Sequence, residues 1–273
     1  MDAVRTSTLR QVTNQLQQLG VRVGGVLLVH TSFRAVGPMD EGPRGLLKAL
    51  RLAVGAAGTI VMPTMTDGES LFSPEATPPV GMGITADLFW RSPGVLRSGH
   101  PTGSFAAQGP LARVVCAPQP LCPPHGLDSP PGRVLALGGQ VLLLGVGHSE
   151  STILHVAEAL ADVPYRVSYP CKVEMNGCET IIDIPEIDHC CRCFARVDDW
   201  LRERSLQSEG VVGNAHARLI SATEAMQEVL RRMQEDQLAF LCAPTMGCSE
   251  CDRARASIPA GWNPGNSVHR QQI

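Results

Sequence analysis

Short apolar runs alternate with segments of helical apolar spacing along the first part of the chain. Residues 7–19 carry apolar side chains at helical spacing and are followed by Gly20, a typical helix stop. The runs 26–29 and 59–63 are short and apolar, as in buried strands, and residues 42–54 between them have helical spacing again. A strand, a helix and a second strand in this order predict a parallel pair of strands.

The same patterns continue downstream. Asn176-Gly177 lies between two alternating segments in 172–184, which predicts a β-hairpin that makes the sheet mixed. We expect helices at 84–91, 191–205 and 221–235, strands within 96–109 and at 141–144, an edge strand at 236–241, and a rigid proline-rich loop at 116–131. The chain is therefore predicted to be a single α/β domain, residues 1–257, with a mixed central β-sheet flanked by helices, followed by a polar tail, 258–273.

Composition narrows the classes of partner. With 44% hydrophobic residues among 273, the chain can bury a substantial core, and only 4% are aromatic, which leaves few platforms for stacking nucleic-acid bases. The net charge of −3 comes without a basic block, so we expect neither a nucleic-acid nor a membrane partner, and a cationic substrate suits the chain better. No run reaches the length of a membrane span and the N-terminus lacks a signal-like apolar stretch, which predicts a cytoplasmic protein.

The segment from Gly138 to His155 carries the clearest sign of chemistry. A buried strand passes through a glycine turn into a helix with His155 in its first turns, where the helix field favours the neutral, basic imidazole. A lone histidine there would more often pack or cap the helix. Downstream, however, Glu186, Asp188 and His189 follow a strand-like run, and a base needs a carboxylate to fix its tautomer. The hypothesis is that His155 is a general base with an acidic partner.

Several familiar motifs are missing from the sequence. Gly145-Val-Gly147 is a fragment of a dinucleotide fingerprint, but the third glycine is absent and a histidine follows. Neither the G-x-x-x-x-G-K-[ST] phosphate loop nor the G-x-S-x-G nucleophile elbow occurs. What remains is base catalysis without an obvious enzyme nucleophile.

Seven segments spread over nearly the whole chain carry a more specific signal. They are Val29-His-Thr-Ser-Phe-Arg-Ala-Val, Gly58-Thr-Ile-Val-Met-Pro, Arg97-Ser-Gly-His-Pro, Phe105-Ala-Ala-Gln-Gly, Gly139-Gln-Val-Leu-Leu-Leu-Gly-Val-Gly-His, Thr152-Ile-Leu-His-Val-Ala-Glu and Val163-Pro-Tyr. Together they resemble the aminoglycoside 3-N-acetyltransferase family, which is structurally distinct from the common acetyl-CoA-dependent superfamily. Cys190-Cys191 and Gly247-Cys-Ser-Glu-Cys-Asp resemble the branch that acts on apramycin and gentamicin-type drugs.

The resemblance implies a three-layer α/β fold and acetyl transfer from acetyl-CoA to the 3-amino group of a 2-deoxystreptamine ring. His155 matches the catalytic base of the family, and an amine must lose a proton before it attacks a thioester. Asp188 and Glu186 match acidic positions placed against the aminoglycoside, and Asp67 or Glu69 lies in a loop of similar role. Carboxylates suit a polycationic sugar, although the same acids can instead orient His155, and the sequence does not separate the two roles.

The resemblance also implies where acetyl-CoA binds. The CoA-facing segment of the family matches His30, Thr31, Ser32, Phe33 and Arg34, whose N–H groups, hydroxyls and guanidinium suit pantetheine and phosphates. Ser98, His100 and Ser104 are expected to line the same side, while His100 taken alone equally fits a hydrogen-bonded core histidine. For the segment that contains His125, Asp128 and Ser129, a structural turn is the preferred interpretation.

Clustered cysteines raise the question of zinc. With no export signal, the ten cysteines are predicted to be reduced thiols or metal ligands. Two pairs brought together would form a closed structural site from Cys190, Cys193, Cys248 and Cys251, and His189 or Cys191 can replace one of them. The alternative is a set of buried thiols. Cys116, Cys122, Cys171, Cys178 and Cys242 are interpreted as ordinary thiols.

Three alternatives stay open at this point. The same fold could acetylate another amine, or the chain could be a zinc-stabilised binding module without turnover, in which case His155→Ala would leave its function intact. The chain could also be a monomer or a homodimer.

Overall fold

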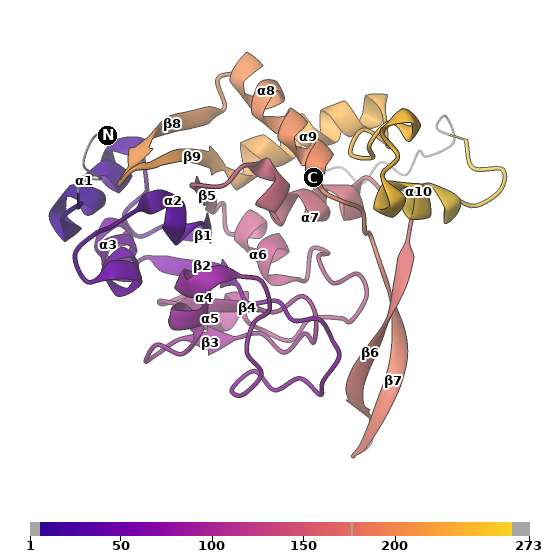
Figure 1. The fold of residues 1–273 in the computed structure, drawn as a ribbon, viewed down its shortest axis with the longest axis horizontal. Coiled ribbons are helices and arrows are strands. Elements are labelled where there is room, and N and C mark those ends of the chain that lie inside the picture. Colours follow the sequence, from indigo (N-terminus) through magenta and orange to yellow (C-terminus); the bar gives the residue numbers. More distant parts are fainter. Residues whose placement is uncertain (1–5, 176, 264–273) are drawn as a thin grey trace.

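Nine strands form two separate sheets in the computed structural model, which describes residues 6–175 and 177–263. The large sheet has seven strands in the order β3-β4-β2-β1-β5-β9-β8, and β6 and β7 pair only with each other (Figure 1). The strands are β1 Val26–Thr31, β2 Thr59–Pro63, β3 Leu96–Arg97, β4 Phe105–Gln108, β5 Gln140–Leu144, β6 Val167–Met175, β7 Cys178–Glu186, β8 Gln207–Val212 and β9 Ala215–Ser221.

The centre of the large sheet is parallel and its flanks are antiparallel. Strand β1 runs parallel to both β2 and β5, with Val26 opposite Thr59 and His30 opposite Leu143. Strands β4 and β9 pair antiparallel with β2 and β5, respectively. All five residues of β2 are buried, as expected for a central strand covered on both faces. The parallel pair and the mixed sheet predicted from the sequence are confirmed.

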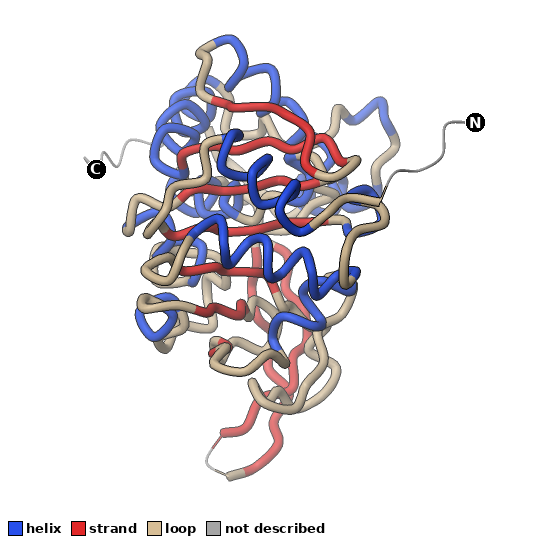
Figure 2. Tube along the Cα trace, turned by 90° about the vertical axis from the view of Figure 1, so that its left-hand side faces the viewer, coloured by secondary structure: helices blue, strands red, loops and turns tan. Residues whose placement is uncertain are grey.

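Helices cover both faces of this sheet, which gives three layers (Figure 2). Alternate residues of β1 point to opposite faces: Leu27 and Val29 pack with α1 and α3, while Val26 and Leu28 pack with α6, α7 and α9. The helices are α1 Leu9–Leu19, α2 Phe33–Val36, α3 Gly42–Val54, α4 Gly83–Trp90, α5 Ala112–Val115, α6 Pro130–Ala136, α7 Ile153–Leu160, α8 Arg196–Glu203, α9 Ala222–Glu235 and α10 Ser249–Ala256, and short 3₁₀ turns lie at His148–Glu150, Arg192–Ala195 and Pro244–Met246.

Two expectations differ from the structure, and one pair of strands was not predicted. The hairpin β6–β7 does form, with Met175 opposite Cys178, but it is a sheet of its own, so β4 and β9 make the large sheet mixed. Residues 236–241 form turns and not an edge strand, because the apolar side chains of Phe240 and Leu241 enter the core directly. Strands β8 and β9 were not predicted; β8 is half exposed and contains a glycine, which weakens its pattern.

The elements that carry His155, Glu186, His189 and the clustered cysteines meet near α7. Figure 1 shows the hairpin projecting from the body, with its base beside α7 and α10. The chain leaves β7 at Glu186 and continues directly into the histidine and cysteine segment 189–193. Among the described helices, none combines the length and apolarity needed to cross a bilayer. The predicted tail 258–273 falls mostly outside the described residues, as does Asn176 of the hairpin turn.

Candidate active site

A fully buried carboxylate, Glu158, organises the centre of the site. Its Oε2 lies 2.8 Å from Nδ1 of His155, and its Oε1 lies 2.8 Å from Nε2 of His189 and accepts a hydrogen bond of 2.5 Å from the Tyr165 hydroxyl. Burial works against ionisation, but His189 and His155 outweigh it and lower the pKa of Glu158 to about 2. Glu158 is therefore a permanent anion with three donors around it.

The tautomer of His189 follows from its two hydrogen bonds. Its Nδ1 accepts the backbone N–H of Cys191 at 3.0 Å, so the ring hydrogen is on Nε2 and is donated to Glu158. The side chain is completely buried. Both nitrogens of His189 have partners, so its ring is held and in turn fixes Oε1 of Glu158. The other carboxylate oxygen, Oε2, is bonded to His155.

His155 is consequently a histidine with one nitrogen committed to a carboxylate and the other facing a thiol. Its Nδ1–H donates to Glu158, one helical turn further along α7, and its Nε2 lies 3.6 Å from the sulfur of Cys191. Its ring packs edge-on against Phe194, with centroids 5.0 Å apart. The side chain is 18% exposed, so a ligand can reach it. The geometry is that of a base whose tautomer is set by a carboxylate.

The charge balance at His155 differs from the expectation. Burial favours the neutral ring, but the Cys191 sulfur and the Glu158 carboxylate raise the pKa of His155 well above its usual value. The N-terminus of a helix acts like about half a positive charge, which lowers the pKa of His155 less than the full negative charge of the adjacent Glu158 carboxylate raises it. The prediction of a bias toward the neutral form was therefore wrong: the resting imidazole is stabilised in its protonated form.

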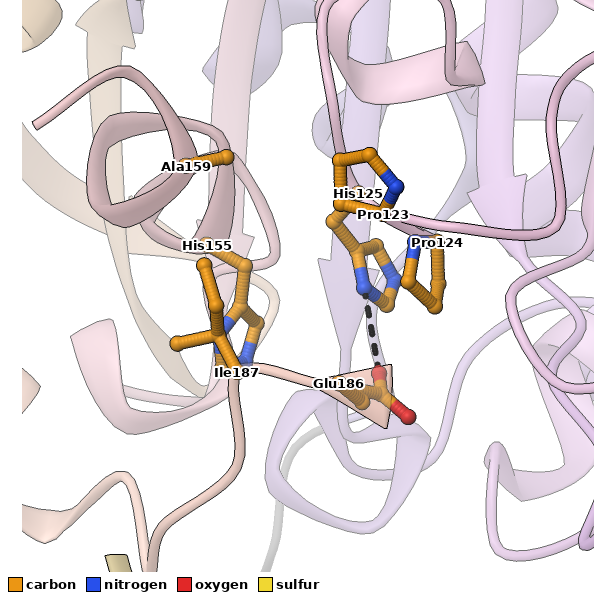
Figure 3. Close-up of a pocket in the computed structure, with 7 residues that line it drawn as sticks. All are labelled: Pro123, Pro124, His125, His155, Ala159, Glu186 and Ile187. Carbon is orange, nitrogen blue, oxygen red and sulfur yellow. Dashed lines mark ion pairs between the residues drawn. The ribbon is translucent and has the colours of Figure 1, made fainter. Parts of the chain in front are cut away.

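A small pocket opens beside His155 (Figure 3). Its volume is about 10 Å³, room for one group the size of a water molecule. The rings of His155 and His125 lie on two sides of it, 5.4 Å apart, and Nδ1 of His125 is 3.5 Å from a carboxylate oxygen of Glu186. Burial raises the pKa of Glu186, but the bond from His125 more than offsets this, and the net shift is downward. The remaining lining residues are Pro123, Pro124, Ala159 and Ile187.

The two predicted acids after β7 lie in different surroundings. Glu186 reaches the pocket, whereas Asp188 accepts a hydrogen bond from the Tyr169 hydroxyl and lies 4.0 Å from Arg253. Neither bonds to His155, whose carboxylate partner is Glu158. The alternative that Glu186 or Asp188 orients the base is corrected accordingly, since the partner comes from the same helix as the base.

The predicted acids of the 64–79 loop are exposed. Asp67 accepts the backbone N–H of Glu69 at 3.1 Å, a local turn. The loop joins the hairpin through Gly68, whose carbonyl accepts the N–H of Lys172 at 3.0 Å. Asp67 and Glu69 therefore lie beside β6, apart from the Glu158 network.

A second, larger cleft of about 280 Å³ opens at the carboxyl end of β1. His30, Thr31 and Ser32 line it, together with Pro63, Met65, Gly81, Met82, Gly83, Val146 and Glu150. Phe33 and Arg34 begin the short helix α2 and are not part of the lining. Burial and the neighbouring His148 lower the pKa of His30 to about 3, so this ring is neutral.

The other residues predicted to bind CoA make hydrogen bonds to groups of the protein itself. Ser98 accepts the N–H of Phe105 at 3.0 Å, and Ser104 donates to the Thr64 carbonyl at 2.8 Å. His100 accepts the N–H of Gly103 at 2.7 Å on Nδ1 and bonds the Leu121 carbonyl through Nε2. All three are buried, and none lines either pocket, so the structure gives them a structural role.

Four sulfurs gather at the base of the hairpin. Cys190, Cys242, Cys248 and Cys251 have all their sulfur atoms within 4.8 Å of one another. Cys242 therefore takes the place predicted for Cys193, whose sulfur lies 3.9 Å from that of Cys242 and outside this set. Hydrogen bonding with the backbone of Cys251 lowers the pKa of Cys248 to about 7, which favours a thiolate.

His155, Glu158 and His189 also lie close enough to share a metal ion. Their nitrogens and oxygens already bond one another, however, and Nδ1 of His189 is used by the backbone. This second group is complete as an acid-base network, so we assign metal-binding capacity to the four cysteines only.

Comparison with known proteins places these features in a family. The model of the aminoglycoside 3-N-acetyltransferase family matches residues 28–234. The chain belongs to this family. Aminoglycoside N(3)-acetyltransferase IV from Salmonella is 48% identical over 256 residues, which cover 92% of this chain and 96% of that enzyme. The family of acyltransferases therefore accounts for residues 28–234 of this chain.

Solved structures of the aminoglycoside 3-N-acetyltransferase family share the fold. A mutant of the acetyltransferase AAC(3)-IVa in complex with gentamicin matches with a TM-score of 0.91 and 46% identity, covering 94% of this chain and all of that chain. A mutant of the same enzyme in complex with apramycin matches with a TM-score of 0.84 and 45% identity, covering 90% and 98%. The single-domain α/β fold with a mixed sheet, predicted from the sequence, is confirmed.

Four residues of the site were not assigned from the sequence. Glu158 and Tyr165 lie within quoted motifs, and the His-x-x-Glu spacing on a predicted helix places Glu158 on the same face as His155. His125 and Cys242 carried no such local signal, because their neighbours in the site come from distant parts of the chain.

Proposed function

We propose that this chain transfers the acetyl group of acetyl-CoA to the 3-amino group of the 2-deoxystreptamine ring in gentamicin- and apramycin-type aminoglycosides, and thereby confers resistance. The observation that carries the proposal is the His155–Glu158 pair beside a pocket that also contains the Glu186 carboxylate. The similarity to a relative with bound gentamicin and apramycin supports the choice of substrate.

The chemistry required of the protein is mainly proton removal. An aminoglycoside amine is protonated at neutral pH, and its nitrogen attacks the thioester only after losing a proton. Nε2 of His155 takes that proton, and Glu158, held by His189 and Tyr165, stabilises the resulting imidazolium. The neutral amine attacks the thioester carbonyl, the C–N bond forms, and the C–S bond breaks. The second proton that the nitrogen must lose ends on the CoA thiolate, and His155 returns its own proton to the solvent. The transfer is direct, without an acyl-enzyme.

The raised pKa of His155 fits a polycationic substrate. In the free enzyme the Cys191 sulfur and the Glu158 carboxylate outweigh burial, raise the pKa of His155 and favour the imidazolium. An ammonium group that enters the pocket repels this positive charge and lowers the pKa of His155, so binding of the substrate itself favours release of the resting proton. The cationic sugar is held by Glu186, with Asp188 and the exposed Asp67 and Glu69 at the surface.

The cleft at the end of β1 is the proposed site for acetyl-CoA. His30, Thr31 and Ser32 contribute to its wall, and Arg34 is exposed beside it for a phosphate. Because His30 is neutral, its contribution is a hydrogen bond or packing and not a charge. The cleft is large enough for a pantetheine arm, which must extend to the pocket beside His155.

We further propose a structural zinc ion at Cys190, Cys242, Cys248 and Cys251. Four sulfurs within 4.8 Å of one another match the tetrahedral set that zinc prefers. Such an ion would tie α10 to the segment that carries His189, without a part in the chemistry. All ten cysteines are unpaired, which agrees with a reducing compartment, the cytoplasm.

Release of free CoA from acetyl-CoA tests the function. The purified protein is assayed with gentamicin, with apramycin and without acceptor, beside His155→Ala and the control His216→Ala, an exposed histidine paired with Glu209. We expect acceptor-dependent thiol release that falls at least about 100-fold in His155→Ala and is unchanged in the control. Release of CoA with other amines, but with neither gentamicin nor apramycin, would show that the enzyme acetylates a different acceptor.

A further inference from the structure

His125 is a buried histidine with one partner. It lies in the proline-rich loop between α5 and α6, is 8% exposed, and packs edge-on against Phe105 with centroids 6.1 Å apart. The loop contacts the hairpin, where the Cys122 thiol donates to the Pro185 carbonyl at 3.3 Å. The sequence led us to interpret this segment as a structural turn. That interpretation does not account for the contact between His125 and the pocket.

The hydrogen bonding of His125 sets its tautomer. Nδ1 faces Glu186 at 3.5 Å, while Nε2 is buried and has no hydrogen-bond partner among the described residues. A ring hydrogen on Nε2 would be a buried donor without an acceptor, which is costly, so the hydrogen is on Nδ1 and faces the Glu186 carboxylate. His125 thus acts on the site through one close polar contact, 3.5 Å from its Nδ1 to Oε1 of Glu186.

Glu186 has one oxygen engaged and one available. The bond from His125 uses Oε1, and no other described side chain pairs with this carboxylate. Figure 3 shows the second oxygen turned away from His125. Glu186 is 25% exposed, and its lowered pKa keeps it anionic. An anion with a free oxygen beside a pocket the size of one water molecule suits an ammonium group.

We propose that His125 is a positioning residue that holds the Glu186 carboxylate against the amino group from which His155 takes a proton. The inference rests on the proposed function and deepens it. A flexible carboxylate at the end of a strand would lose rotamer freedom when it binds the amine, whereas a carboxylate held beforehand by His125 does not.

Two substitutions separate this role from packing. His125→Asn keeps an N–H donor near the position of Nδ1, and His125→Phe keeps an aromatic ring without the donor. We expect His125→Phe to raise KM for the aminoglycoside about ten-fold or more, the loss typical of a hydrogen bond to a charged group, with KM for acetyl-CoA unchanged. His125→Asn should restore most of that loss.

A double-mutant cycle with Glu186→Gln gives the decisive comparison. If His125 acts through Glu186, the effects of His125→Phe and Glu186→Gln on KM are not additive, and the double variant resembles Glu186→Gln alone. Equal defects in His125→Phe and His125→Asn, or additive effects in the cycle, would overturn the proposal. Thermal unfolding of each variant identifies any that do not fold. If His125→Phe does not fold, His125→Asn still tests the proposal, which requires that its KM for the aminoglycoside stays near the wild-type value. Wild-type protein without activity on any aminoglycoside would instead refute the proposed function.

Discussion

Nδ1 of His155 lies 2.8 Å from Oε2 of Glu158, three residues further along α7. Both side chains project from one face of one helix, so their separation depends on helical geometry and not on loop conformation. The other oxygen of the same carboxylate is held by His189 and Tyr165. The His155 ring is therefore oriented by an anion that itself has almost no freedom to move.

Replacing Glu158 with Gln tests how this anion tunes the base. The carboxylate raises the pKa of His155, so its removal lowers that pKa. Because the base must be neutral, activity rises with pH as His155 loses its proton, and we expect this acidic limb of kcat/KM to move to lower pH in Glu158→Gln. The plateau should fall about 100-fold, since the imidazolium formed in the reaction loses its counter-charge. A pH profile checks both effects.

The control for this experiment is Glu209→Gln, which removes a carboxylate paired with Arg202 and His216 on the β8–β9 side of the molecule. Its pH profile should match the wild type. An acidic limb at the same pH in Glu158→Gln and the wild type would show that another group titrates.

His189 should matter for stability more than for proton transfer. Its two hydrogen bonds satisfy the buried Glu158 carboxylate and the Cys191 amide. In His189→Ala both lose a partner, and we expect the free energy of unfolding to fall by about 2–4 kcal/mol. His189→Gln retains a donor at the reach of Nε2 and should lose less. Urea denaturation measures both, and equal losses in the two variants would contradict a role through the hydrogen bond to Glu158.

The layers of the fold were predictable because their signals are local. Buried strands β1, β2 and β5 are apolar runs, and the intervening helices have a strong apolar face, so the pattern determines both their type and their order. Strand β8 lies at the edge of the sheet, where its half-exposed residues give a weak alternation. For residues 236–241 the error was the opposite: a strand was predicted where the chain forms turns, because apolar residues in those turns fill the core.

Within the site, predictability ended where distant segments meet. His155 was predicted from a strand that leads into a helix, and Glu158 lies within the same helix. The bond between His125 and Glu186, by contrast, joins a loop to the end of a hairpin 61 residues later, and Cys242 reaches Cys190 across 52 residues. No periodicity in the sequence encodes such contacts, which depend on how the hairpin is placed against the body.

Cys191 provides a test of direct transfer. Its sulfur lies 3.6 Å from Nε2 of His155, and a thiol beside a histidine and a carboxylate is also the arrangement of a cysteine nucleophile. If the acetyl group passes directly to the amine, Cys191→Ala should retain activity within about ten-fold of the wild type, because only a neighbour of the base is lost. Intact-protein mass spectrometry of the wild type with acetyl-CoA alone should show no acetyl adduct. An adduct that disappears in Cys191→Ala would establish an acyl-enzyme.

The four-cysteine set predicts a specific pattern of metal loss. Cys242 belongs to the set and Cys193 lies just outside it, although both are near Cys190 in space or in sequence. Native mass spectrometry should therefore find zinc bound to the wild type and to Cys193→Ala, and little or none bound to Cys242→Ala. Loss of the ion frees α10 from the segment that carries His189, so the melting temperature of Cys242→Ala should fall by about 5–10 °C. Zinc retained in Cys242→Ala but lost in Cys193→Ala would show that the set predicted from the sequence was the right one.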